Sequence, residues 1–257
     1  MFDIPSKYAA DNSIEPKTFI RRDMKKAEKD RIRENLLAVR LVWQIAGEEV
    51  PSLVNKDYNC SVIMGLDIKL KAIKHSAGGV GSPHVRYFAE LVQHMIKAPC
   101  VIRFYDHTEE VYTFAHKRLS RTDVSQVVIE NRVETPPLSL DFPDKTAEML
   151  RQCLAFGALL NKSDKLSLYL EATVKAFIIS HPKLYSGIEQ LLDRKLWYNR
   201  EDILLLFGRL LELQRLNGEL KAEKLPGARA RLNGEIKRVI GELYLPHQSR
   251  EWTALFD

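Results

Sequence analysis

The sequence lacks long hydrophobic runs and has little cysteine, and both facts exclude classes of protein. No stretch approaches the roughly 18 apolar residues that a membrane-spanning helix needs, so we expect no membrane contact. The first residues do not lead from a charged segment into an apolar one, so we expect no secretion signal. The three cysteines, Cys60, Cys100 and Cys153, are an odd number and lack metal-ligand spacing. Free thiols in apolar surroundings are typical of a reducing compartment, which favours a cytoplasmic protein.

Several catalytic and nucleotide-binding motifs are also absent from the sequence. The glycine-rich stretch Gly78–Gly81 is not followed by Lys-Ser/Thr, and it does not match the dinucleotide-binding pattern. The seven histidines include no pair at metal-ligand spacing, and no serine lies in a G-x-S-x-G motif. Backbone N–H groups of the glycine-rich stretch could hold an anion, but a surface loop is the simpler interpretation.

Positive charge is modest overall and concentrated near the N-terminus. The chain has 39 basic and 34 acidic side chains, a formal net charge of +5, and 45% hydrophobic residues. This composition indicates a globular protein with some preference for polyanions. Eight basic residues stand against three acids between Lys17 and Arg33, and five of them recur at helical spacing. These five are Arg21, Arg22, Lys25, Lys26 and Lys29. They predict a stripe that contacts the phosphates of DNA or RNA, and the alternative is a solvated helix face.

The first part of the chain, residues 1–140, reads as a small mixed β-sheet with flanking helices. Alternation of apolar and polar residues from Ser61 to Leu70 predicts a half-buried strand. Ser82 and Pro83 are a good helix cap and first residue, so a helix should begin there. Over this part we expect an extended arm (1–16), helices (23–46 and 83–97), a hairpin (99–105 with 111–116) and a further strand (126–133).

The second part, residues 141–257, reads as helical throughout. We expect helices over 144–161, 164–180, 186–196, 201–224 and 228–244, followed by an aromatic tail with Trp252 and Phe256. The fold class is therefore α+β, with an all-helical C-terminal part that ends in an antiparallel helical hairpin.

This hairpin contains a near-repeat, RLNGELK from Arg215 and RLNGEIK from Arg231. Apolar residues run through both copies in alternating steps of three and four, which is typical of a short coiled-coil seam. The hairpin should bring Asn217 near Asn233 and let the helices approach at Gly218 and Gly234. The rival interpretation makes each Asn-Gly the end of a helix. We expect a docking surface, within the protein or for a partner, made of Leu206, Leu210, Leu213, Asn217, Asn233 and Ile236.

The triplet Asp67-Ile68-Lys69 is the strongest candidate for catalysis. In nucleases of the restriction-endonuclease type, a carboxylate at this spacing holds Mg²⁺ while the lysine polarises the water or the phosphate. A second carboxylate is required, and Glu49 and Asp57 are the near candidates upstream. The alternative is an Asp and a Lys on the solvated face of a strand.

Five segments carry a family resemblance: FDIP…EPKTFI, VRLVWQIA, MGLDIKLK, KAPCVIRF and ARLNGEIKRVIGEL. They stand in the same order in the prokaryotic domain of unknown function (DUF) 4391 family, which the chain resembles over nearly its whole length. Family members commonly carry a glutamate-containing strand where this chain has Leu66–Leu70, and a shorter connection after it. The resemblance carries no established activity. It implies that such proteins are encoded beside helicases and DNA methyltransferases of antiviral systems.

These observations favour a non-catalytic, nucleic-acid-associated accessory subunit of a prokaryotic antiviral-defence or DNA-processing assembly. Its partners would be a helicase or methyltransferase and a DNA or RNA backbone, without a cofactor. One alternative is a Mg²⁺-dependent nuclease that uses Asp67 and Lys69, for which Mg²⁺ would be required. The other alternative is a structural adaptor that does not contact nucleic acid.

Overall fold

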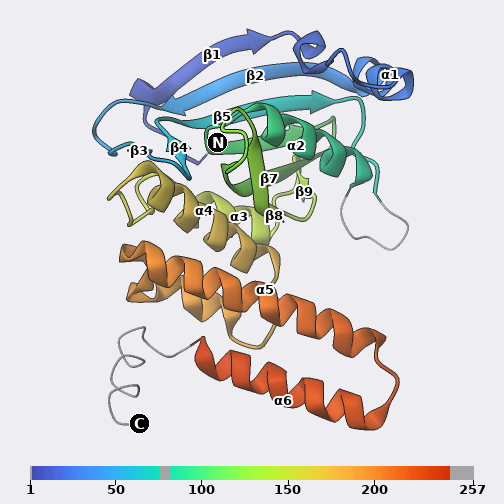
Figure 1. Cartoon of the computed structure of the whole chain (residues 1–257), viewed down its shortest axis with the longest axis vertical. Helices are drawn as coiled ribbons and strands as arrows, with labels where there is room; N and C mark the ends of the chain where they lie inside the picture. Colours follow the sequence, from blue (N-terminus) through green and yellow to red (C-terminus); the bar gives the residue numbers. More distant parts are fainter. Residues whose placement is uncertain (1, 76–81, 244–257) are drawn as a thin grey trace. The chain divides into compact units, whose positions relative to one another are not determined.

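A mixed sheet of seven strands forms the N-terminal part of the protein (Figure 1). The structure is a computed structural model, and it describes residues 2–75 and 82–243. The glycine-rich stretch and the aromatic tail lie outside these described residues. The strand order is β1 (Ala9–Ile14), β2 (Leu36–Ile45), β5 (Ile63–Leu70), β6 (Cys100–Tyr105), β7 (Glu109–Leu119) and β8 (Val127–Glu134), with β9 (Leu138–Ser139) also on β7. Strands β3 (Leu53–Val54) and β4 (Asn59–Cys60) form a separate ribbon.

Strands β5 and β6 are parallel, whereas the other neighbouring strands of the sheet are antiparallel. A parallel pair needs a crossover connection, and helix α2 (Pro83–Met95) provides it. The predicted start of this helix is confirmed, because the Ser82 hydroxyl accepts a hydrogen bond from the Val85 N–H and Pro83 is the first helical residue. The predicted hairpin and the strand that follows it are confirmed as β6, β7 and β8.

The remaining helices are α1 (Lys26–Asn35), α3 (Lys145–Cys153), α4 (Lys165–Ser180), α5 (Arg200–Ala222) and α6 (Pro226–Glu242). Four short 3₁₀ segments also occur in the described chain: Ser6–Tyr8, Pro16–Phe19, Ile188–Asp193 and Lys195–Tyr198. The α+β fold class is confirmed. The helix expected over 186–196 is two 3₁₀ segments, and the one expected over 144–161 ends at Cys153.

The long helix expected over 23–46 is wrong. Its second half is β2, and the extended arm that should precede it contains β1, the strand that pairs with β2. Register shifts at a bulge between Leu41 and Trp43, so that Leu41 lies opposite Leu66 and Trp43 lies opposite Gly65. A second register shift lies between Leu36 and Ala38, so the buried residues Leu36 and Val39 are three positions apart, a spacing that resembles a helix.

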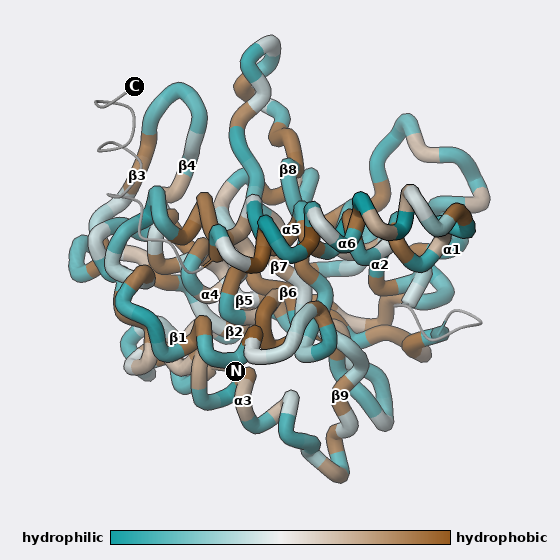
Figure 2. Tube along the Cα trace, turned by 90° about the horizontal axis from the view of Figure 1, so that it is seen from below, coloured by the Kyte–Doolittle hydropathy of each residue, from teal (hydrophilic) through white to brown (hydrophobic). Residues whose placement is uncertain are grey.

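One face of the sheet packs against α1 and α2. The core there includes Ile32 of α1, Phe88 and Val92 of α2, and Ile68 and Phe104 of the parallel strands, all of them buried. Figure 2 shows hydrophobic residues along the central strands and hydrophilic residues along the peripheral loops.

The opposite face of the sheet is covered in part by α4. The Tyr169 hydroxyl donates a hydrogen bond to the Cys100 carbonyl (2.9 Å) and accepts one from the Ala115 N–H (2.8 Å). Trp43 and Phe114 of the sheet line a small apolar cavity together with Leu168 and Tyr169 of α4. The part of this face that α4 leaves uncovered carries polar side chains, which are described below.

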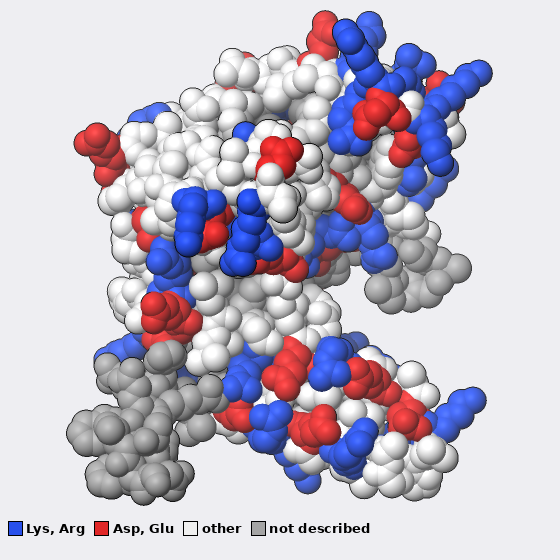
Figure 3. Space-filling view, in the orientation of Figure 1, with Lys and Arg blue, Asp and Glu red and all other residues white. Residues whose placement is uncertain are grey.

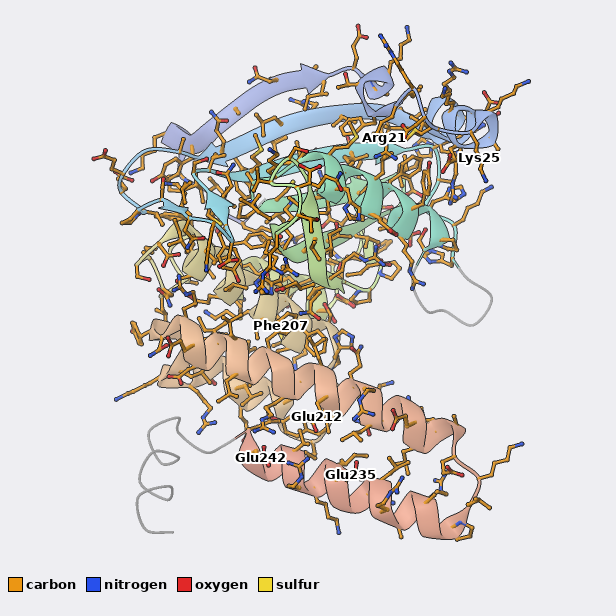
Figure 4. The ribbon with its side chains drawn as sticks, in the orientation of Figure 1. Arg21, Lys25, Phe207, Glu212, Glu235 and Glu242 are labelled. Atoms are coloured by element: carbon orange, nitrogen blue, oxygen red, sulfur yellow. The ribbon has the colours of Figure 1, made fainter. Side chains whose placement is uncertain are left out.

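Helices α5 and α6 form the expected antiparallel hairpin. Gly218 and Gly234 lie inside these helices, so the alternative in which each Asn-Gly ends a helix is wrong. Ion pairs join the two helices at Arg209–Glu242 and at Arg238–Glu212 (3.4 Å). Figure 4 shows Glu212 and Glu242 between the two ribbons.

The chain divides into two compact units, Met1–Ser180 and His181–Asp257. The division falls at the end of α4, whereas the sequence placed a boundary at residue 140. Among the described residues, no helix is long and apolar enough to cross a membrane.

Candidate functional site

The five predicted phosphate-binding residues, Arg21, Arg22, Lys25, Lys26 and Lys29, are here called the N-terminal basic cluster. They do not form a stripe on one helix, because α1 begins only at Lys26. Lys25 is the residue before the helix, and its N–H donates to the Glu28 carboxylate at 2.8 Å. The chain turns before this cap and is anchored there by the buried Met24 side chain.

The N-terminal basic cluster is nevertheless gathered in one place. The Lys29 ammonium donates to the Arg22 carbonyl (3.1 Å), which holds the turn against the first part of α1. Four of the five residues are exposed, and Lys29 is half-buried. Figure 3 shows Lys and Arg side chains crowded around α1 with fewer acids among them, and Figure 4 places Arg21 and Lys25 there.

Acidic neighbours neutralise little of this charge. Arg21 lies 3.4 Å from Asp23, in a pair whose two side chains are more than half exposed. Within the described part of the chain, Arg22, Lys25 and Lys26 make no ion pair. An exposed group of cations with few counter-charges attracts polyanions, because binding releases the counterions condensed on the nucleic acid.

Asp67 and Lys69 lie on the same face of β5, as predicted, and both are half-buried. Asp67 is opposite Arg103 of β6, and Arg103 is opposite Tyr112 of β7. Two residues further along the strands on the same face, Lys69 of β5 is opposite Tyr105 of β6, and Tyr105 is opposite Glu110 of β7. The sheet register therefore brings together a set that we call the Arg103 cluster: Asp67, Arg103, Tyr105, Glu110 and Tyr112.

Arg103 lies between the two carboxylates of this cluster. Its Nη1 donates to Asp67 Oδ2 at 3.1 Å, and its Nε donates to Glu110 Oε2 at 2.5 Å. The guanidinium also lies over the Tyr105 ring, 4.7 Å from the ring centre. The Glu110 side chain is 6% exposed and that of Asp67 is 17% exposed, so solvent screens these contacts weakly.

Burial affects the pKa of Asp67 and that of Tyr112. It raises the pKa of Asp67, and the charge of Arg103 partly offsets the increase. Burial and the neighbouring Glu110 carboxylate raise the pKa of the Tyr112 hydroxyl. The second oxygen of Asp67, Oδ1, is buried and has no hydrogen-bond partner among the residues that the structure describes.

Neither of the two predicted second carboxylates, Glu49 and Asp57, belongs to the Arg103 cluster. Glu49 accepts hydrogen bonds from the Lys7 ammonium and the Tyr8 hydroxyl. Asp57 follows β3, and its carbonyl accepts from the Leu119 N–H. Glu110 was missed, although the alternation of Glu110, Tyr112 and Phe114 along β7 places it on the correct face. Residues 2–75 and 82–243 contain no group of three or more His, Cys, Asp or Glu that could hold a metal.

Half of the predicted docking residues of the hairpin are buried. Leu206, Leu210 and Leu213 are at most 5% exposed, which favours packing within the protein over contact with a separate partner. The Asn217 amide donates to the Leu184 carbonyl (3.0 Å), and Asn233 is exposed. Ile236 is half-buried.

The expected close approach of the hairpin helices at glycine is wrong. A Cβ at Gly218 or Gly234 would have no atom within 4 Å, and both glycines are exposed. Ion pairs and apolar side chains such as Val239 join the helices instead.

Several buried charged residues were not predicted from the sequence, and Lys117 and Glu171 are two of them. The Lys117 ammonium donates to the Gln93 and Ile96 carbonyls and to the Gln93 side-chain oxygen, which caps the end of α2. Burial lowers the pKa of Lys117 to about 8. Glu171 of α4 is fully buried beside Lys175. Both are structural, because their polar atoms are occupied by contacts within the chain.

The model of a domain of unknown function (DUF4391) matches residues 2–243. No curated protein and no solved structure matches the chain. Because the family match covers nearly the whole chain, the protein belongs to the DUF4391 family.

Proposed function

We propose that the protein is a non-catalytic accessory subunit that binds a nucleic-acid backbone through the N-terminal basic cluster. The observation that carries this proposal is the exposure of Arg22, Lys25 and Lys26 without ion-pair partners in the described chain. Exposed ammonium and guanidinium groups contact phosphates well, and phosphate contacts position a protein without reading the bases. We therefore expect weak binding that is largely indifferent to sequence.

Replacing all five residues of the cluster by glutamine should remove most of this binding. If three to five phosphates are contacted, the logarithm of the affinity for duplex DNA should fall with the logarithm of salt at a slope of roughly −3 to −4. The variant should show a slope near zero and a melting temperature close to that of the parent, because exposed charges contribute little to stability. Fluorescence anisotropy over a salt series measures the slope.

The hairpin provides a charge-matched control for this experiment. Arg215, Lys221, Lys224, Arg231 and Lys237 are all exposed. Glutamine at these five positions changes the net charge equally and should leave the slope unchanged if binding is local to the N-terminal basic cluster. Equal losses in both variants would indicate attraction by net charge alone. A cluster variant that binds as well as the parent would contradict the proposal and favour the adaptor without nucleic-acid contact.

We further propose that this subunit acts within a larger assembly that processes nucleic acid. The support is the family resemblance, which implies a helicase or a DNA methyltransferase of an antiviral system as the partner. The exposed residues of the hairpin, such as Asn233, are available for such a contact. Co-purification of a partner with the full chain, lost when residues 201–243 are deleted, would support this role. Recovery of the same partner by the truncated chain would contradict it.

A Mg²⁺-dependent nuclease is the second candidate function. It is favoured by the shared face of Asp67 and Lys69 and by the parallel strands β5 and β6. It is opposed by Arg103, whose guanidinium stands between the carboxylates. Cleavage of DNA or RNA with Mg²⁺ or Mn²⁺, abolished by Asp67→Ala and by Lys69→Ala, would establish the nuclease and overturn the non-catalytic function.

A further inference from the structure

In the Arg103 cluster, one guanidinium lies between two carboxylates, and Arg40 of β2 lies opposite one of them, Asp67. Asp67 and Glu110 contribute two carboxylates, and Arg103 contributes one positive charge that is always present, because its guanidinium does not deprotonate in proteins. One oxygen of each carboxylate accepts a hydrogen bond from the guanidinium. The Oδ1 atom of Asp67 has no partner within the described chain. Carboxylate oxygens are also ligands that Mg²⁺ prefers in proteins, usually together with water.

We infer that Arg103 is a built-in cation that occupies the position of a divalent metal between Asp67 and Glu110 and excludes the metal from it. This inference rests on the non-catalytic part of the proposed function and gives it a structural cause. It does not depend on phosphate binding by the N-terminal basic cluster.

Three contacts fix Arg103 in this position. The two carboxylates bind different nitrogens of the guanidinium, and the Tyr105 ring lies against it. The Arg103 side chain is only 23% exposed, so water competes weakly for the guanidinium. A metal ion would have to displace all three contacts and shed part of its own hydration shell. Mg²⁺ loses water reluctantly, so the arginine should be favoured over the free ion.

The inference predicts that removing Arg103 uncovers a metal site. Three proteins are titrated with Mn²⁺ alone: the wild type, Arg103→Met and the double variant Asp67→Asn/Glu110→Gln. Electron paramagnetic resonance measures the bound ion. The wild type should bind Mn²⁺ no more tightly than the double variant, which lacks both carboxylates. Arg103→Met should bind Mn²⁺ at least about tenfold more tightly than wild type, a difference of about 1.4 kcal/mol. Methionine retains an apolar stem against Tyr105, which favours folding of the variant.

A triple variant, Arg103→Met/Asp67→Asn/Glu110→Gln, identifies the ligands. It should lose the gain in Mn²⁺ affinity, and it removes the uncompensated carboxylates, so it folds even if Arg103→Met does not. Should Arg103→Met be unstable, its melting temperature should rise with Mn²⁺ while that of the triple variant does not. Two results would overturn the inference: Mn²⁺ binding by wild type that Asp67→Asn abolishes, or an Arg103→Met protein that gains neither affinity nor thermal stability from Mn²⁺. Cleavage of DNA with Mn²⁺ is measured on the wild-type sample: cleavage would overturn the non-catalytic function, whereas the Mn²⁺ affinities of the variants test the inference about Arg103.

Discussion

Gly65→Ala should lower the free energy of unfolding by about 3 kcal/mol or more, at the upper end of what overpacking a core costs. A Cβ at Gly65 would lie 2.0 Å from Cε2 and 2.3 Å from Nε1 of the Trp43 indole. Trp43 is only 5% exposed, so its ring has little room to move away. Gly65 also lies in a strand that is bonded on both sides, to β2 and to β6, which prevents the backbone from shifting.

Denaturation in urea followed by circular dichroism measures this effect. Gly157→Ala is the matched control, because Gly157 is in the same compact unit and its Cβ would meet nothing within 4 Å. The control should be as stable as the parent or slightly more stable, since alanine restricts the unfolded chain. In the double variant Gly65→Ala/Trp43→Leu, the two costs should be less than additive, because leucine frees the space above residue 65. Equal stability of Gly65→Ala and the control would contradict the packing of Trp43 on Gly65.

Glu171→Ala should destabilise the protein by about 3–5 kcal/mol, the usual cost of removing one partner from a buried ion pair. The Glu171 carboxylate accepts hydrogen bonds from the backbone N–H groups of Leu160 (2.9 Å) and Asn161 (2.7 Å). It also lies 2.6 Å from the Lys175 ammonium. It thereby attaches the segment after α3 to α4. Alanine removes the acceptor of two backbone N–H groups and the counter-charge of the buried Lys175 ammonium, which is costly.

Glu90→Ala is the control for Glu171→Ala. Glu90 is an exposed residue of α2, and its loss should change stability by less than about 0.5 kcal/mol. The pair variant Glu171→Gln/Lys175→Met should be less harmful than the sum of its single changes. Glutamine still accepts from the two N–H groups, and no unpaired charge remains. If Glu171→Ala unfolds at the same denaturant concentration as Glu90→Ala, the carboxylate does not anchor this segment.

Local signals in the sequence determined much of the architecture. The alternation before Leu70 predicted β5, and the Ser82-Pro83 pair predicted the start of α2. The apolar spacing through both Asn-Gly sites predicted the α5–α6 hairpin. Each of these features depends on residues that are near one another in the chain. Periodicity and capping act over such distances, and they are readable without a fold.

Contacts between distant residues were decided only by the tertiary structure. The strand β2 was mistaken for helix, because its bulge against β5 depends on pairing with a strand that lies beyond the next ribbon. Glu110 was not recognised as the neighbour of Asp67, because Arg103 joins them across three strands whose register no local pattern specifies. Likewise, Lys117 and Glu171 look like ordinary surface charges until packing removes water from them. Burial and strand register are properties of the assembled chain, since they depend on which segments come together and not on the composition of any one segment.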